Sequence, residues 1–129
     1  GGAPAMIEHL ETPRTEKPWG YEVLIAKTDV YVGKVLHVTA GQTLSLQYHE
    51  RKDETIYLHQ GDAVMVYHDN DGSPGEYAMK RGDSFHIPPH SVHRLVAVTD
   101  CDFFEVSTPQ LDDVVRLQDQ YGRQGTSAP

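Results

Sequence analysis

The chain has 129 residues, of which 38% are hydrophobic, and a formal net charge of -8 at pH 7. This length allows one domain with a core of its own, and the acidic charge argues against a nucleic-acid or anionic-membrane partner. The single cysteine, Cys101, excludes an intramolecular disulfide framework. The sequence has neither an apolar run of membrane-spanning length nor a signal pattern, so a cytoplasmic protein is expected.

The alternation of apolar and polar residues along the chain predicts an all-β fold. Residues 1–5 are interpreted as an expression-vector remnant, residues 6–124 as one domain and residues 125–129 as a flexible tail. Within the domain, apolar and polar residues mostly alternate with a period of two between regularly spaced turn residues, which is typical of a closed or nearly closed β-sandwich. Nine strands are expected, at residues 21–26, 31–39, 43–49, 55–58, 63–67, 76–79, 84–87, 93–98 and 102–107.

After Pro109 the period changes. Apolar side chains occur at positions 111, 114 and 115, and Asp112 or Asp113 can cap the start of a helix. The sequence therefore predicts a short helical segment over residues 111–118 that packs outside the β-structure.

Gln47, His49, Glu54 and His93 are predicted to form one metal site. Gln47 and His49 are two residues apart on a predicted strand, so their side chains project from the same face. The polar run 50–53 predicts a turn that returns Glu54 to the side of His49, and His93 begins a later strand. Two imidazoles, one carboxylate and one amide oxygen suit a divalent transition metal.

The spacing of these residues resembles the two sequence motifs of the cupin superfamily. The first motif spans residues 41–61 and contains His49 and Glu54, and the second spans residues 82–93 and ends at His93. The resemblance implies a single jelly-roll β-barrel with the metal inside it.

Four further segments resemble the cupin domain of type II mannose-6-phosphate isomerases. They are residues 17–23, 44–49, 87–95 and 113–123. Those enzymes bind their metal, usually zinc, with a Gln-His-Glu-His set, which Gln47 matches. The resemblance implies a sugar-phosphate isomerase or epimerase that works through an enediol, and a homodimer. Zinc is the implied metal, with iron, manganese, nickel and cobalt as alternatives.

Aldose-ketose interconversion also needs a base that moves a proton between two carbons. Lys34, His90 and Arg94 are the candidate catalytic residues, with His37, Tyr48 and His86 also close to the motifs in sequence. Lys34 lies on a predicted strand, where it either faces water or extends into the barrel.

The phosphate of such a substrate needs basic partners. Arg51, Lys52 and Arg94 are the candidate substrate-binding residues, because the first two follow His49 closely and planar guanidinium groups match phosphate oxygens.

Two other function classes remain open. A metal-dependent oxygenase or lyase on a small organic substrate would use the same four ligands with iron or manganese, and iron-loaded protein would then consume oxygen. A non-catalytic sugar-binding cupin would bind its ligand even after the metal is removed.

Overall fold

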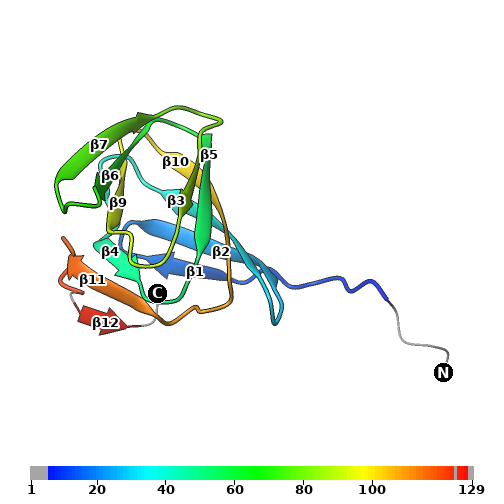
Figure 1. Ribbon diagram of the computed structural model, residues 1–129. Coiled ribbons are helices and arrows are strands. Elements are labelled where there is room, and N and C mark those ends of the chain that lie inside the picture. The colour runs from blue at the N-terminus through cyan, green and yellow to red at the C-terminus, as the bar shows by residue number, and fades with distance from the viewer. Residues whose placement is uncertain (1–5, 124, 128–129) are drawn as a thin grey trace, which may run out of the picture.

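The described part of the chain folds into two antiparallel sheets of six strands each (Figure 1). A computed structural model describes residues 6–123 and 125–127. Sheet I contains, in spatial order, β1 (Arg14–Lys17), β2 (Gly20–Lys27), β3 (Val32–Val38), β10 (Cys101–Ser107), β5 (Glu54–Gln60) and β8 (Ser84–Ile87). Sheet II contains β12 (Gly125–Ser127), β11 (Val114–Gln118), β4 (Leu46–His49), β9 (His93–Ala97), β6 (Ala63–His68) and β7 (Pro74–Met79).

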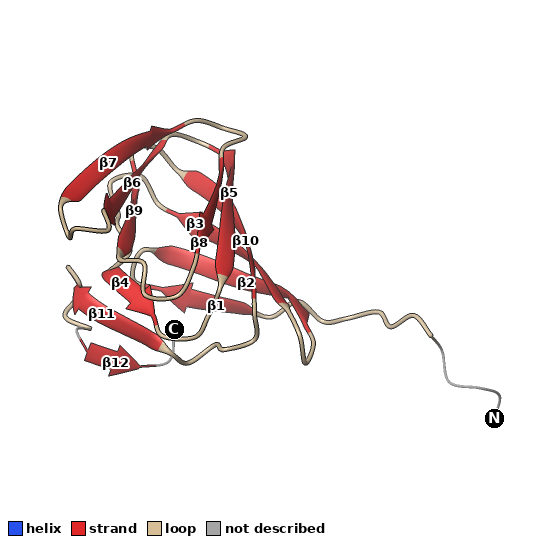
Figure 2. Ribbon diagram, in the orientation of Figure 1, coloured by secondary structure: helices blue, strands red, loops and turns tan. Residues whose placement is uncertain are grey.

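The alternation of side chains along each strand defines an inner and an outer face. In β10, Cys101 and Phe103 are fully buried while Phe104 is exposed. The described residues form strands and loops without a helix (Figure 2), so the all-β prediction is confirmed. None of them forms a helix with the length and apolar character needed to cross a bilayer.

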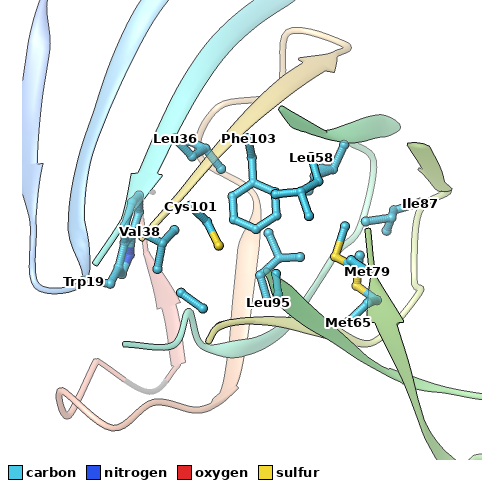
Figure 3. Close-up of a cluster of buried hydrophobic side chains, with 13 residues drawn as sticks. Trp19, Leu36, Val38, Leu58, Met65, Met79, Ile87, Leu95, Cys101 and Phe103 are labelled. Atoms are coloured by element: carbon cyan, nitrogen blue, oxygen red, sulfur yellow. The ribbon is translucent and has the colours of Figure 1, made fainter. Parts of the chain in front are cut away.

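The apolar core lies between the sheets. Figure 3 shows Phe103 and Leu58 of sheet I packed with Leu95 and Met65 of sheet II. Burying side chains of this size stabilises the fold by about 1.5–3 kcal/mol each. Further along the same strands the inward positions become polar, as at Glu105 of β10, so the core ends where a buried polar site begins.

The predicted helix at residues 111–118 is wrong. Val114–Gln118 forms β11, in which Val114 pairs with His49 of β4 and Arg116 pairs with Gln47. Two consecutive β-branched residues favour a strand, and Val114 and Arg116 alternate as buried inner-face residues. In so short a segment, the spacing of the apolar residues fitted both the period of a helix and the period of a strand.

A closed or nearly closed β-sandwich was expected, and the structure has the two packed sheets but does not close them into one barrel. At one side, β8 and β7 are edge strands that pair only with β5 and β6 among the described residues. Between β4 and β9 the pairing reduces to Gln47 opposite His93.

At the C-terminal end the structure extends beyond the expected domain limit at residue 124. The predicted vector remnant, residues 1–5, lies outside the described residues. Of the predicted tail, residues 128–129 also lie outside them, whereas Gly125–Ser127 forms β12 and pairs with β11.

Candidate metal centre and the adjoining cavity

Three buried side chains converge at the polar end of the core. His49 ends β4, Glu54 begins β5 and His93 begins β9, and one donor atom from each lies within 4.8 Å of the others. Nε2 of His49 is 3.5 Å from Oε2 of Glu54, and Nε2 of His93 is 3.3 Å from Oε1. Three of the four predicted ligands therefore meet, although they come from three separate strands.

Hydrogen bonds on the far side of each imidazole fix its orientation. Nδ1 of His49 lies 3.2 Å from Oδ1 of Asp113, and Nδ1 of His93 lies 2.8 Å from the carbonyl oxygen of Ser91. Both partners accept, so both Nδ1 atoms carry hydrogen, and a neutral ring then presents its Nε2 lone pair to the site. This arrangement is typical of metal-binding histidines.

The spacing of the donor atoms fits a small divalent ion. Ligands about 2.1 Å from a tetrahedral ion lie roughly 3.4 Å from one another, which matches the separations of 3.3 and 3.5 Å at Glu54. Oε2 of Glu54 is buried and has no hydrogen-bond partner within the described part of the chain. Lys52 Nζ lies 3.1 Å from it, at ion-pair distance but without hydrogen-bond geometry. His49, Glu54 and His93 thus form a candidate site for a divalent metal.

Gln47 lies beside these donors. Its Nε2 is 3.4 Å from Nε2 of His49, and its Oε1 accepts a hydrogen bond from Ser45 Oγ at 2.7 Å. Rotating the amide by half a turn would bring Oε1 toward the donors, and the Ser45 hydroxyl could then accept from the amide instead. The geometry therefore allows Gln47 to act as the fourth ligand.

Burial and neighbouring charges set the protonation states of the candidate ligands. Burial lowers the pKa of His49 to about 4, so this imidazole is neutral at pH 7. Burial raises the pKa of Glu54, but the hydrogen bond from His93 and the charge of Lys52 outweigh it and lower the pKa below the usual value. A neutral imidazole and an ionised carboxylate are the states that ligate metals.

A cavity of about 50 Å³ adjoins the donors. Five basic and two acidic side chains line it, together with Gln47 and His49. They are Lys17, Lys34, Lys52, Arg116 and Arg123, and Glu22 and Glu105.

The basic groups are close enough to influence one another. Burial lowers the pKa of Lys17, and the charges of Lys34, Arg123 and Arg116 lower it further against the opposing effect of Glu22. Burial and the charge of Arg123 likewise lower the pKa of Arg116. An anion entering the cavity would relieve this repulsion.

Comparison with known proteins identifies the fold family. A family model described as a cupin domain matches residues 34–107, more than half of the chain. The chain belongs to the cupin family. This cupin is 30% identical over 123 residues to the alginate biosynthesis protein AlgA of Pseudomonas putida, a match that covers 92% of the chain and 24% of that protein. The chain therefore spans about a quarter of the length of this relative.

Solved structures of other proteins share the fold. Oxalate decarboxylase from Bacillus subtilis at pH 4.6 matches 83% of this chain, and 30% of its own chain, with a TM-score of 0.73 and 17% identity. CapF with the inhibitor 3-isopropenyl-tropolone matches 90% of this chain, and 36% of its own, with a TM-score of 0.71 and 20% identity. At these identities the likeness concerns the fold alone.

Lys52, a predicted phosphate ligand, is buried inside this cupin. Its Nζ lies 3.1 Å from both Oε2 of Glu54 and Oε2 of Glu105. Burial alone would lower the pKa of Lys52, but the two carboxylates raise it above its usual value. The lysine is thus a permanent cation at the inner end of the cavity, beside the metal donors.

Lys34, one of the predicted catalytic residues, also faces inward. It is buried on β3, lines the cavity and donates from Nζ to Oε1 of Glu22 at 3.2 Å. Of the two orientations that the sequence left open, the structure has the inward one, in which Lys34 extends between the two sheets.

The other predicted polar residues do not line this cavity, although Arg94 lines a smaller neighbouring pocket with Gln47, Glu54 and His93. His90 is exposed in the loop before β9, with a positive φ of 68°, and its N–H donates to the carbonyl of His49 at 2.7 Å. Arg51 is exposed and donates its backbone N–H to Asp113. Arg94 donates Nε to the carbonyl of Leu44 at 2.9 Å and a terminal nitrogen to that of Gln118 at 3.1 Å. The Arg94 guanidinium is therefore engaged with the backbone of sheet II.

Four functional candidates were missed from the sequence, namely Asp113, Arg116, Arg123 and Glu105. Arg116 reaches the site because β11 is a strand, and the helix prediction concealed its alternation with Val114. Glu105 is an acidic residue at an inward position of an otherwise apolar strand, which is a signal that strand alternation could have provided.

Proposed function

We propose that this cupin is a metal-dependent isomerase that interconverts an aldose phosphate and a ketose phosphate. The observation that supports this proposal is the cation-lined cavity beside the metal donors. Five basic and two acidic side chains line it, on a chain whose formal net charge is -8. Such a local reversal of charge favours a small anionic substrate over a neutral one.

Arg116 and Arg123 are the proposed phosphate ligands, in place of Arg51 and Arg94. Arg116 is directly opposite Gln47 in the β11–β4 pair, so its side chain shares the inner face with the metal donors. Arg123 donates to Asp119 at 3.0 and 3.2 Å, which orients its guanidinium along the cavity wall. Guanidinium groups bind phosphate oxygens through paired, charge-assisted hydrogen bonds.

The opposite end of the proposed substrate would lie at the metal donors. A divalent ion held by Gln47, His49, Glu54 and His93 supplies a Lewis acid that polarises a carbonyl and its neighbouring hydroxyl. Glu105 and Lys34 face each other across the β3–β10 pair and both line the cavity. The Glu105 carboxylate is the proposed base that accepts the proton from one carbon as the enediol forms and returns it to the neighbouring carbon as the enediol collapses, and the Lys34 ammonium is the proposed group that stabilises the developing negative charge.

The proposal also includes zinc as the bound metal and the cytoplasm as the location of the protein. Zinc suits the mixed nitrogen and oxygen donor set, and the resemblance of Gln47 and of residues 113–123 to type II mannose-6-phosphate isomerases favours the same metal and reaction.

Turnover of mannose 6-phosphate to fructose 6-phosphate by zinc-loaded protein is the first assay, followed by a panel of other sugar phosphates. Turnover in heavy water should place deuterium in the product, because a proton removed by the protein exchanges with solvent. Arg116→Met should raise KM for the phosphorylated sugar by roughly 10-fold or more, the effect of losing a charge-assisted hydrogen bond. Arg51→Met, at an exposed arginine, is the matched control and should change KM less than twofold. No turnover across the panel would overturn the proposal.

A metal-dependent oxygenase or lyase is the second candidate. Two histidines and one carboxylate, as in His49, Glu54 and His93, are also the ligands of non-haem iron oxygenases. Oxygen consumption by iron-loaded protein, without isomerisation by the zinc form, would favour this candidate. A sugar-binding module would bind sugar phosphate equally well after chelation of the metal and would turn over neither substrate.

A further inference from the structure

A second pocket, of about 320 Å³, lies on the side where β7 and β8 are edge strands. Its walls come from β6 and β7 of sheet II, from β8 of sheet I and from the loop that leads into β9. Among the described residues, none lines both this pocket and the cation-lined cavity, whose walls include β2, β3, β4 and β11. The two openings therefore lie at different ends of the strand order. We call this second pocket the edge pocket.

The edge pocket extends from the surface to the apolar core. Six of its lining side chains are apolar or aromatic, namely Met65, Tyr67, Tyr77, Phe85, Ile87 and Val92. Met65 of β6 and Ile87 of β8 are buried members of the core and come from opposite sheets (Figure 3). Tyr77 of β7, by contrast, is 48% exposed. A ligand could thus enter past the tyrosines and contact the core directly.

The aromatic walls of the edge pocket are held in place by their neighbours. The rings of Tyr77 and Phe85 meet edge to face at a centroid distance of 5.2 Å and an angle of 70°, although β7 and β8 belong to different sheets. The Tyr67 ring lies against Gly75, where an added Cβ would come within 2.5 Å of its Cζ atom. Rings that are already positioned can pack on a flat ligand without a further ordering cost.

The edge pocket lacks the charges that line the cavity. Within the described part of the chain, its walls include no Asp, Glu, Lys or Arg. Nε2 of His86 lies 2.7 Å from Oδ1 of Asp53, and Nδ1 of His93 lies 2.8 Å from the carbonyl oxygen of Ser91. A charged ligand would lose its water without meeting an opposite charge. A few polar groups, such as the Ser91 hydroxyl, suffice to orient a neutral ligand.

We propose that the edge pocket binds a small, uncharged molecule that carries a flat aromatic ring. Small-molecule pockets have volumes of about 300–1,000 Å³, and an apolar cavity of about 150 Å³ holds one benzene molecule. The 320 Å³ of the edge pocket can therefore hold two fused rings. This site is separate from the proposed phosphate ligands, and its occupation does not depend on the proposed isomerase activity.

The test is titration of the zinc-loaded full chain with indole, a neutral molecule of two fused rings. The chain has 3 methionines, so methionine methyl groups labelled with carbon-13 give a simple spectrum. The Met65 signal should shift and saturate, because Met65 lines the edge pocket. The Met6 signal is the internal control, since Met6 is 94% exposed near the N-terminus, and it should not move. Saturating inorganic phosphate should change the dissociation constant of indole less than twofold.

Two variants and one charged analogue complete the test. Tyr77→Ala removes one aromatic wall and should raise the dissociation constant of indole by roughly fivefold or more. Tyr31→Ala is the matched control, because Tyr31 is 53% exposed but does not line the edge pocket, and it should change the constant less than twofold. Indole-3-carboxylate keeps the two rings but adds a negative charge, so it should bind at least roughly tenfold more weakly than indole.

Circular dichroism and metal content must match the unmodified protein in both variants. The shift of the Met65 signal is measured on the unmodified chain and so does not depend on how the variants fold. The proposal would be overturned by the lack of a saturable Met65 shift, by competition between indole and phosphate, or by equal losses in Tyr31→Ala and Tyr77→Ala. Binding of indole-3-carboxylate as tight as that of indole would overturn the preference for an uncharged ligand.

Discussion

Asp113 holds His49 and the loop that follows it with one carboxylate. Oδ1 of Asp113 lies 3.2 Å from Nδ1 of His49, while Oδ2 accepts the backbone N–H groups of Arg51 at 2.7 Å and Lys52 at 3.0 Å. Burial raises the pKa of Asp113, but the two backbone hydrogen bonds and His49 outweigh it and lower the pKa, so the group is ionised at neutral pH. Asp113 therefore positions a candidate metal ligand without being one of the converging donors.

Asp113→Asn should weaken metal binding by about 10–100-fold, the usual effect of losing the partner of a ligating histidine. The amide can keep the hydrogen bonds from Arg51 and Lys52 through its oxygen, but it no longer supplies the charge that stabilises the His49 ring. Competition with a coloured chelator measures the affinity. The neighbouring, exposed Asp112 provides the control, and equal losses in Asp112→Asn and Asp113→Asn would argue for a general effect of charge.

The ligands themselves were predictable because their geometry is mostly local. Gln47 and His49 share a strand face by the period of two, and a short polar turn separates His49 from Glu54. The strand that begins at His93 was also predictable. The all-β class followed from the same alternation, repeated along the chain.

The rest of the site depends on strand register between distant segments. The contact between His49 and Asp113 joins residues 64 positions apart, and the pairing of Arg116 with Gln47 exists only because β11 adds to β4. An eight-residue segment with two adjacent valines fitted a helical period as well as a strand. Lys52 was expected in the open loop, and only the tertiary structure shows that two buried carboxylates draw it inward.

Removing either imidazole should abolish stable metal binding. His49→Ala and His93→Ala each delete one of the three donors that lie within 4.8 Å of one another, so the purified variants should contain little metal by plasma mass spectrometry. His68→Ala should keep close to one ion per chain, because His68 is not among those donors. Full metal content in both ligand variants would contradict the assignment.

The two histidines of the candidate metal centre should titrate at different pH values in the metal-free protein. Burial lowers the pKa of His49 to about 4. Burial also lowers the pKa of His93, but the hydrogen bond and charge of Glu54 outweigh it and raise the pKa above 6.5. His93 should therefore keep its proton to a higher pH than His49, and nitrogen NMR of the rings can follow both.

Metal affinity should therefore depend on the titration of His93. Below the pKa of His93 a metal ion must displace one proton, so the affinity should fall by about tenfold per pH unit. Above that pKa, the metal affinity should be nearly independent of the titration of His93. If binding of one metal ion displaced two protons near pH 6, His49 would also have to be protonated there, contrary to its burial.

Lys52→Met should destabilise the protein by about 3–5 kcal/mol, because it leaves the carboxylates of Glu54 and Glu105 buried without their shared cation. Since the pKa of Lys52 is raised on folding, its contribution is complete below pH 10.5 and is lost only as the pH rises above that value. Urea unfolding of the metal-free protein at pH 7 measures the loss. Lys80→Met, at an exposed lysine, should change the stability by less than about 0.5 kcal/mol.

Adding Glu105→Gln to Lys52→Met should recover part of the lost stability, since it removes one of the two unpaired charges. If the double variant is less stable than Lys52→Met alone, the carboxylates are not the source of the destabilisation.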